Sequence, residues 1–457
     1  MSFDVSILKK YTKAGPRYTS YPTAPVFHID YNSQKYTADL EARDSSRGIS
    51  LYVHLPYCDT LCYFCGCNMK VDNDRAVVSS YIDLLEKEII QTKKHISSDS
   101  QVRQLHWGGG TPTHLTPAEI RRVGYFLREH FDFAEDAECG VEIDPRALTE
   151  ESIVALKDVG FTRASMGLQD FDPNVQKAVN RIHNYDLVSE VVSWIKGNGF
   201  TSLNLDLIYG LPLQTVSTFR KTLELCSQLD VQRFAVFNYA HLPNMIKHQK
   251  LIKSTDLPTP DERLEILEMT GNYLDAQGYR YIGMDHFSKE SDSLYIAQQN
   301  KTLRRNFQGY STHADLDIIS FGASGISQLD RVYAQNVKVI KDWRESITNG
   351  QIPVIQRGWR LSDEDVERRD LIYRLMCHFE LDTDEFSQMY QCEFKYKYKF
   401  ELEQLNCFFE DACLSWQDGS ILKVSDHGRL VIRNIVMVFD DYLKNMQSNV
   451  PRFSSTI

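Results

Sequence analysis

The sequence predicts an α/β fold: an open, partial (β/α)6 barrel, preceded by an N-terminal arm and followed by a small, mainly helical C-terminal domain. Short apolar segments alternate with amphipathic ones between about residues 50 and 240, as expected for a parallel sheet with helices outside it. These strand–helix units number six, fewer than the eight of a closed barrel. Beyond about residue 360 the pattern becomes charged and helical.

The predicted elements follow from apolar periodicity. Six strands are expected at 50–56, 103–107, 140–144, 163–169, 203–208 and 233–239. Helical patterns lie between them, for example at 75–95, 116–131, 185–198 and 215–229. Further strand-like segments at 279–284 and 317–321 could extend the sheet. The chain therefore divides into an arm, a barrel and a C-terminal domain, at 1–48, 49–350 and 351–457.

Composition and charge exclude several classes of partner. The 457 residues carry a formal net charge of −11, so no global basic field attracts nucleic acid or anionic lipid. No apolar run is long enough to span a membrane, and residues 1–5 lack the pattern of a secretion signal. We therefore expect a cytoplasmic protein without nucleic-acid or membrane partners; a monomer is a separate expectation. An anionic substrate would need a local basic pocket.

The inward faces of the predicted strands are unusually polar. Apolar residues share one face of each strand, and the other carries Glu142 with Asp144, Ser165 with Gln169, and Asn204 with Asp206. A barrel packed only for stability would place branched apolar residues there. The pattern therefore indicates a bound polar ligand, although single acids could instead cap helices or bind water in the lumen.

Four of the ten cysteines, Cys58, Cys62, Cys65 and Cys67, lie within ten residues, directly after the first predicted strand. In a large chain without a secretion signal, such a cluster indicates a metal site rather than a disulfide framework. The spacing Cys-x3-Cys-x2-Cys puts three thiolates on one tight loop, and three thiolates can hold a [4Fe–4S] cluster with one iron left open. The alternative is a zinc knuckle that uses all four cysteines.

This loop resembles the signature of the radical S-adenosylmethionine (SAM) superfamily. The resemblance implies that Cys58, Cys62 and Cys65 bind the cluster, whose open iron binds SAM. The second predicted strand ends in three consecutive glycines, 108–110, which allow close backbone approach and leave amides free for a ligand. In that superfamily the corresponding turn contacts the methionine part of the cofactor.

Several further segments narrow the resemblance to the family of bacterial oxygen-independent coproporphyrinogen III oxidases. The match runs from about residue 10 to the C-terminus, in order, through segments 15–23, 52–56, 142–146, 165–171, 206–212, 237–243, 305–310, 322–327 and 429–435. The resemblance implies conversion of two propionates of coproporphyrinogen III to vinyl groups. It also implies a low-potential electron donor such as a flavodoxin-like protein as a partner.

The resemblance assigns two groups of cofactor-binding residues. The cluster-bound SAM would contact Tyr52, Phe64, Gly109, Glu142 and Ile326. A second SAM would lie against Gly110, Thr111, Gln169, Arg181, Asp206 and Ala240. For the substrate, which has four carboxylates, Arg17 of the arm is a candidate partner, with Tyr18 and Tyr21 as stacking rings; otherwise the arm only packs on the barrel.

Three alternatives remain open. One is a haem-binding chaperone of the same superfamily, which keeps the cluster but does not decarboxylate this substrate. The others are a radical methyltransferase that opens haem and a non-enzymatic metal-binding protein. The Cys-Gly-Cys ending of the cysteine loop and the Gly-Pro-Arg-Tyr sequence of the arm favour the oxidase.

Overall fold

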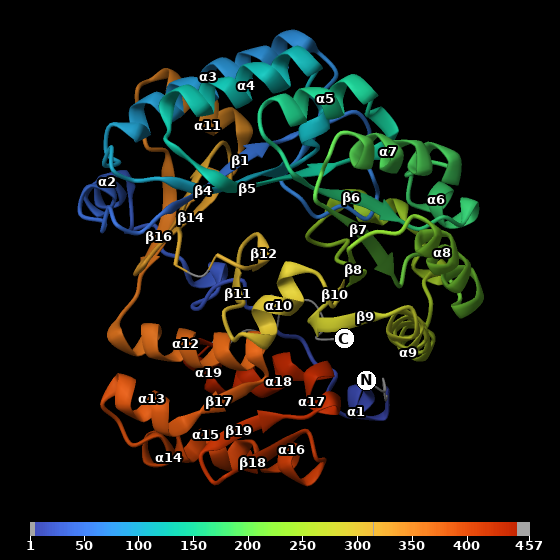
Figure 1. The fold of residues 1–457 in the computed structure, drawn as a ribbon, viewed down its shortest axis with the longest axis vertical. Helices are drawn as coiled ribbons and strands as arrows, with labels where there is room; N and C mark the ends of the chain where they lie inside the picture. Colours follow the sequence, from blue (N-terminus) through green and yellow to red (C-terminus); the bar gives the residue numbers. More distant parts are fainter. Residues whose placement is uncertain (1–4, 314, 446–457) are drawn as a thin grey trace.

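The computed structural model describes residues 5–313 and 315–445. A twelve-stranded sheet in the order β16-β15-β14-β13-β1-β4-β5-β6-β7-β8-β10-β9 forms the larger part of the molecule, and a separate layer of mostly helical structure lies below it in Figure 1. The predicted α/β class and the helical C-terminal region are confirmed. None of the helices in the described ranges is both long and apolar enough to cross a bilayer.

Six consecutive strands of the sheet are parallel and match the six predicted ones. They are β1 (Ile49–Leu55), β4 (Val102–Gly109), β5 (Phe133–Ile143), β6 (Arg163–Gln169), β7 (Ser202–Tyr209) and β8 (Arg233–Asn238). Parallel strands bring their carboxyl ends to one edge, where barrel-type folds place their ligands. The loops after β1, β4, β5 and β6 therefore meet.

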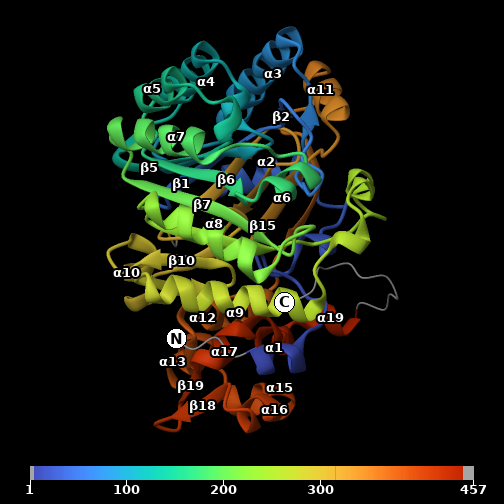
Figure 2. The same ribbon diagram turned by 90° about the vertical axis from the view of Figure 1, so that its right-hand side faces the viewer.

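The connecting helices cover the outer face of these strands (Figures 1 and 2). They are α3 (Arg75–Lys93), α4 (Pro117–His130), α5 (Glu150–Asp158), α6 (Pro173–Ala178), α7 (Tyr185–Gly197) and α8 (Val216–Gln228). Helix α4 shows why they form: Thr116 and Glu119 make a capping box at its start, and Ile120, Val123 and Leu127 are buried at helical spacing. Helix and strand side chains together make the main core.

The sheet extends past the six strands at both edges. Beside β1 lies the parallel strand β13 (Asp317–Phe321), followed by the antiparallel strands β14 (Ile326–Leu329), β15 (Val332–Asn336) and β16 (Ile355–Arg360). Beside β8 lie β10 (His286–Lys289) and β9 (Tyr279–Gly283). The two strand-like segments at 279–284 and 317–321 thus lie on opposite sides of the six parallel strands, β9 at the edge of the sheet and β13 between β14 and β1. The domain boundary at residue 350 stays a prediction, and β16 follows it.

The C-terminal region packs around the long helix α12 (Asp363–His378), whose Leu371, Leu375 and Met376 are fully buried. Shorter helices follow, from α13 (Thr383–Tyr390) to α19 (Asp441–Asn445). A small sheet of β17 (Glu380–Asp382), β19 (Ile421–Val424) and β18 (Leu414–Gln417) was not predicted. Strands of three or four residues are too short to give a clear periodicity.

The N-terminal arm contains α1 (Val5–Tyr11) and α2 (Ser33–Glu41), with irregular backbone between them. Helix α1 lies against the C-terminal region (Figure 2) and contributes Leu8 to its core. Tyr18 and Tyr21 are buried in the same core, and the Tyr18 hydroxyl donates to Asp440 at 2.9 Å. The predicted role of these two tyrosines as substrate-stacking rings is therefore wrong in this structure, because packing already covers both rings.

Candidate active site

The cysteine loop lies at the carboxyl end of the parallel strands. Strand β1 leads through Pro56 into the short strand β2 (Tyr57–Cys58), which pairs with β3 (Lys70–Val71) and closes the loop at its base. Cys58, Cys62 and Cys65 all line one cavity of about 140 Å³, and Cys67 lines it as well. The close spacing of the four cysteines thus brings their thiols to one cavity at the end of β1.

This cavity, called here the thiol cavity, brings together most of the predicted site residues. Ten of them line it: Cys58, Cys62, Cys65, Phe64, Gly110, Thr111, Glu142, Gln169, Arg181 and Asp206. They come from the cysteine loop, from strands β5, β6 and β7, and from the loops after β4 and α6. Tyr52, Gly109, Ala240 and Ile326 are not among its lining residues.

The donor set fits an iron–sulfur cluster. Cys58, Cys62 and Cys65 present three thiols to one cavity, and thiolates are the usual ligands of iron–sulfur clusters. The guanidinium groups of Arg146 and Arg181 each lie 3.4 Å from Cys62 Sγ, so two cations flank this sulfur. A hydrogen bond from the Cys67 thiol lowers the pKa of Cys65 to about 6.

The glycine turn is required by close packing against the cysteine loop. A Cβ at Gly110 would lie 2.6 Å from both the carbonyl carbon and oxygen of Pro56. Gly109 has a φ of +118°, which favours glycine, and a Cβ there would meet the ring of His54 at 2.6 Å. The Gly109 amide donates to Glu142 Oε2 at 3.1 Å, so the turn also fixes that carboxylate at the cavity wall.

Glu142 is held by a ring system at the inner end of the thiol cavity. His106 Nε2 lies 3.4 Å from Glu142 Oε1, and the Tyr52 ring stacks on His106 with 6.0 Å between centroids. Burial alone would raise the pKa of Glu142, but the His106 contact and the Gly109 amide lower it below its usual value. Neither Tyr52 nor Gly109 lines the thiol cavity, but both support Glu142. Gly109 does so directly through its amide, and Tyr52 does so through His106.

Asp144, which the sequence places on the polar face of its strand without a further role, and Arg146, which it does not assign, both line the thiol cavity. Asp144 Oδ2 accepts from Arg181 Nη1 at 2.9 Å and from Arg146 Nη2 at 2.7 Å, beside Cys62. Burial opposes ionisation, yet the Arg181 and Arg146 charges lower the pKa of Asp144 to about 2. The Asp-Pro-Arg sequence at the end of a barrel strand was the available signal. Arg181 therefore already has a carboxylate partner.

Gln169 has an unusual backbone and an unsatisfied polar atom. Its φ of 67° lies in the left-handed region, which costs a side-chain-bearing residue about 1 kcal/mol. The register between β6 and β7 shifts at the same point. Gln169 Oε1 is buried without a hydrogen-bond partner among the described residues. Such an atom beside a cavity is what a polar ligand would satisfy.

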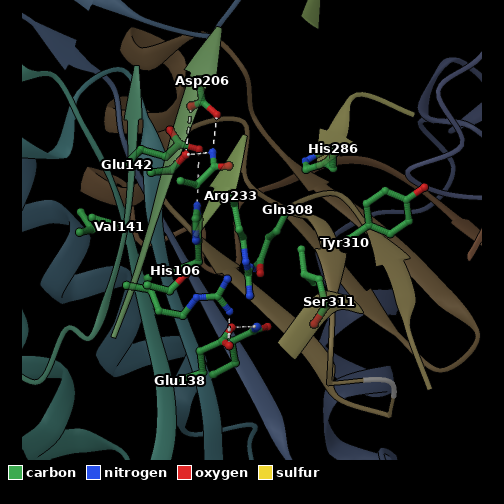
Figure 3. A pocket seen from close by; sticks show the side chains of 18 of the residues that line it. His106, Glu138, Val141, Glu142, Asp206, Arg233, His286, Gln308, Tyr310 and Ser311 are labelled. Carbon is green, nitrogen blue, oxygen red and sulfur yellow. Dashed lines mark hydrogen bonds and ion pairs between the residues drawn. The ribbon is translucent and has the colours of Figure 1, made fainter. Parts of the chain in front are cut away.

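Asp206 lines the thiol cavity and also a second cavity of about 210 Å³, shown in Figure 3. It accepts from Ser165 Oγ at 3.0 Å and Asn204 Nδ2 at 2.7 Å. Burial and the nearby Glu142 charge raise the pKa of Asp206 to about 7. Glu142 is shared by both cavities too, so these two carboxylates separate them.

The second cavity, called here the lumen cavity, is lined mainly by polar groups. Arg163 pairs with Glu138, and Arg233 Nε lies 2.7 Å from Asp292 Oδ2. Opposite them in Figure 3 are His286, Gln308 and Tyr310, from β10 and the segment around β11 (Arg304–Asn306) and β12 (Gly309–Ser311). The predicted polar face of the strands therefore encloses a polar space.

Ala240 and Ile326 lie further from the thiol cavity. The Ala240 carbonyl accepts from Gln249 Nε2 at 3.1 Å, and the same amide donates to the Phe64 carbonyl at 3.0 Å. Ile326 starts β14, and its carbonyl accepts a hydrogen bond from Ser320. The structure thus links Ala240 to the cysteine loop through Gln249.

The comparisons with known proteins agree with this geometry. The family model of the Radical SAM superfamily matches residues 52–226. An oxygen-independent coproporphyrinogen III oxidase of Escherichia coli (strain K12) is 41% identical over 457 residues, 100% of this chain and 99% of that protein. The enzyme of the same name from Pseudomonas aeruginosa is 40% identical over 458 residues, with 100% and 99% covered.

A solved structure supports the same relationship. The Escherichia coli coproporphyrinogen III oxidase, described as a radical SAM enzyme, superposes with a TM-score of 0.92 at 41% identity, over 97% of this chain and 99% of that one. The sequence match thus covers the whole chain, and the fold match covers 97% of it. The chain belongs to the family of oxygen-independent coproporphyrinogen III oxidases within the radical SAM superfamily.

Proposed function

We propose that the protein decarboxylates coproporphyrinogen III in haem biosynthesis without oxygen, converting the propionates of rings A and B to vinyl groups and giving protoporphyrinogen IX. The observation that carries this proposal is the end-to-end match to enzymes named for this reaction. The thiol cavity beside a second, polar cavity is the arrangement that such chemistry needs. Each event removes one hydrogen atom and one electron from a propionate side chain and releases carbon dioxide.

Membership of the radical SAM superfamily confirms the expected cofactors, a [4Fe–4S] cluster and SAM. When bound, they supply a primary carbon radical that takes a hydrogen atom from the β-carbon of a propionate. Cys58, Cys62 and Cys65 are the proposed iron ligands. The protein's own task is to orient the substrate and to keep water and oxygen from the radical.

The SAM-binding residues are proposed in two groups. Tyr52, Phe64, Gly109, Glu142 and Ile326 would bind or support the cluster-bound SAM. Gly110, Thr111, Gln169, Arg181, Asp206 and Ala240 would bind a second SAM. The unpaired Gln169 Oε1 and the Asp206 carboxylate support this assignment, because each offers an acceptor to hydroxyl or ammonium donors. Arg181 would orient the site through Asp144, which it already binds.

The carboxylates of the substrate require cations, and the arm supplies one. The partly exposed Arg17 and the buried Arg305 and Arg433 form a group, called here the arginine group. Arg305 Nε donates to the Arg17 carbonyl at 3.2 Å, and Arg433 donates to the carbonyls of Gly15 and Pro16. Arg17 also forms an ion pair with Asp285. Even so, burial and the Arg433 and Arg305 charges lower the pKa of Arg17 to about 9.

The arginine group lies directly behind the lumen cavity. The Arg17 guanidinium is 5.6 Å from the Phe237 ring centroid and that of Arg305 is 4.7 Å from the Tyr310 ring centroid, and both rings line this cavity. Arg305 Nη1 is buried without a hydrogen-bond partner among the described residues. A carboxylate of the substrate would pair with this nitrogen and relieve the repulsion within the group.

A low-potential electron donor of the flavodoxin type, a monomeric state and a cytoplasmic location complete the proposal. The low-potential donor is required because one electron is consumed for each SAM cleaved. The acidic chain, with a formal net charge of −11, supports the absence of nucleic-acid partners.

The deciding experiment is anaerobic turnover with product identification. Reconstituted protein with coproporphyrinogen III, SAM and dithionite should release two equivalents of carbon dioxide and form protoporphyrinogen IX through a mono-vinyl intermediate. A haem-binding chaperone would also carry a cluster and cleave SAM, so neither of those assays separates the two functions. If cluster-loaded protein binds haem tightly and releases no carbon dioxide, the protein is a haem-binding chaperone and not the oxidase.

A further inference from the structure

A surface groove of about 1160 Å³ lies beside the cysteine loop. It is called here the Met69 groove and is formed by residues 68–70, by residues 338–340 and by the exposed side of α11 (Ile340–Thr348). Tyr57 and Val77 contribute to its floor. Nothing in the reaction proposed above uses this surface.

The Met69 groove and the thiol cavity share a wall. Met69 lines both of them, so one thioether side chain separates the surface groove from the cavity that holds the three cysteines. The backbone joins them as well: Cys58 pairs with Val71 in the β2–β3 sheet, and the Lys70 amide donates to the Pro56 carbonyl at 2.8 Å. An electron arriving in the groove therefore has a short, bonded route to the cysteines.

The groove is basic on an acidic chain. Its lining contains Lys70, Lys338, Lys341 and Arg344 against one acid, Glu345. The chain as a whole carries a formal net charge of −11, so this concentration of cations is local. Such a patch steers and orients an acidic protein more than it increases affinity.

Two of the four cations of the groove, Lys338 and Lys341, are available to a partner, whereas Lys70 pairs with Asp72 at 2.6 Å and Arg344 donates to Ser80. Lys338 and Lys341 are exposed, and in the described part of the chain Lys338 forms no ion pair. The Lys341 ammonium lies 3.7 Å from Glu345 in an exposed pair that contributes little. Between the two lysines Val339 is 53% exposed, so an apolar centre lies within a charged rim, as at interfaces between proteins.

The groove is also rigid, so that binding need not order it first. Trp343 of α11 is fully buried, and Arg344 Nη2 donates to Ser80 Oγ of α3 at 2.7 Å. On the other side, Asn68 Nδ2 donates to the Lys338 carbonyl at 3.0 Å and ties the cysteine loop to the basic segment. A preformed surface lowers the entropic cost of docking.

We propose that the Met69 groove is the docking site for a small acidic protein that carries a low-potential one-electron cofactor. The inference rests on the proposed function, which consumes one electron for each SAM cleaved. In the docked complex one electron leaves the carrier, as when a flavin hydroquinone becomes a semiquinone, and reduces the cluster from the 2+ to the 1+ state. No atom is transferred and no bond is made or broken in that step.

The test is direct binding of oxidised flavodoxin to cluster-loaded protein at low ionic strength, measured by isothermal titration calorimetry. The double variant K338E/K341E should weaken binding about tenfold or more, and the difference should shrink in high salt. K221E/K399E is the matched control, since Lys221 of α8 and Lys399 of α15 (Lys399–Gln404) are exposed lysines outside the groove and the net charge changes by the same amount. It should bind flavodoxin as the unaltered protein does.

Turnover with two reductants separates this proposal from the proposed function. Dithionite needs no docking surface, so K338E/K341E should match the unaltered protein in dithionite-driven carbon dioxide release and in cluster content. With flavodoxin hydroquinone the KM for the carrier should rise about tenfold. Equal flavodoxin affinity in K338E/K341E, K221E/K399E and the unaltered protein overturns the docking site. Absence of dithionite-driven turnover in the unaltered protein overturns the proposed function instead.

Discussion

Arg181 donates from Nη1 to Asp144 Oδ2 at 2.9 Å while the same nitrogen lies 3.4 Å from Cys62 Sγ. Both side chains are more than nine-tenths buried. The pair therefore sets both the charge and the position of the groups around a proposed iron ligand. Arg146 makes the same two contacts from the other side. This arrangement predicts that the Asp144 carboxylate matters for the cluster through the two guanidinium groups that it holds beside Cys62.

Replacing Asp144 by asparagine should destabilise the protein by about 3 kcal/mol, because two guanidinium groups lose their buried counter-charge. It should also lower the iron content after anaerobic reconstitution. Chemical denaturation and iron analysis measure the two effects. The control Asp158→Asn breaks the exposed pair with Arg121 and should cost less than about 1 kcal/mol. Equal effects of both variants would contradict the assigned role of Asp144.

Serine at Cys58, Cys62 or Cys65 should abolish the cluster, because each thiolate is proposed to bind one iron and a hydroxyl is a poor substitute. Iron and sulfide content, with electron paramagnetic resonance after reduction, reports the loss. Cys67→Ser should keep the cluster, as should Cys407→Ser, which lies in the C-terminal region. A Cys62→Ser variant that retained the cluster while Cys67→Ser lost it would reverse the ligand assignment.

Alanine at Gly110 should weaken SAM binding, since its Cβ would meet backbone atoms of Pro56 at 2.6 Å and push the cysteine loop away. Overpacking against backbone costs about 1–3 kcal/mol, which corresponds to roughly a 5- to 150-fold rise in the dissociation constant for SAM. Gly197→Ala is the control, because no atom lies within 4 Å of its Cβ position at the end of α7. That variant should bind SAM normally, and a normal Gly110→Ala variant would refute the close-packing argument.

Asp206 should make the stability of the cofactor-free protein depend on pH. Folding raises its pKa from 3.8 to about 7 through burial and the Glu142 charge. The folded state therefore binds the proton more tightly, and this stabilisation is present at low pH and is lost as the pH rises from about 4 to 7. Asp206→Asn should reduce this slope of the unfolding free energy, whereas the exposed Asp261→Asn should not. Identical slopes in the unaltered protein and Asp206→Asn would show that Asp206 is ionised throughout.

The sequence predicts the barrel and the cysteine loop well, because both depend on local patterns. Alternating apolar segments mark the six parallel strands, and four cysteines within one loop need no partner elsewhere in the chain. The ion pair between Asp144 and Arg181 joins residues on different loops. The sequence shows the segment that contains each residue but not that the two side chains meet. The burial of Tyr18 against Asp440, 422 residues later, has no local signal at all.

The position of the arm also changes how its role should be tested. Removing residues 1–22 would delete Leu8, Tyr18 and Tyr21 from the C-terminal core, so loss of product could reflect unfolding alone. A point substitution at Arg17 avoids this, because its guanidinium faces Asp285 and Phe237 rather than that core. The charge of Arg17 can therefore be tested while the rest of the arm stays in place.

Arg17→Gln should raise the KM for coproporphyrinogen III about tenfold, since one charge-assisted contact with a carboxylate contributes roughly 1.5–3 kcal/mol. Cluster content and SAM affinity should be unchanged, because Arg17 does not line the thiol cavity, and the cavity that it does line contains no residue of the cysteine loop. Arg17→Lys should recover part of the affinity by restoring the charge. Arg331→Gln, at an exposed arginine paired with Asp363, is the control and should leave KM unaltered. If Arg17→Gln and Arg331→Gln give the same KM for coproporphyrinogen III at equal thermal stability, the arginine group does not bind the substrate.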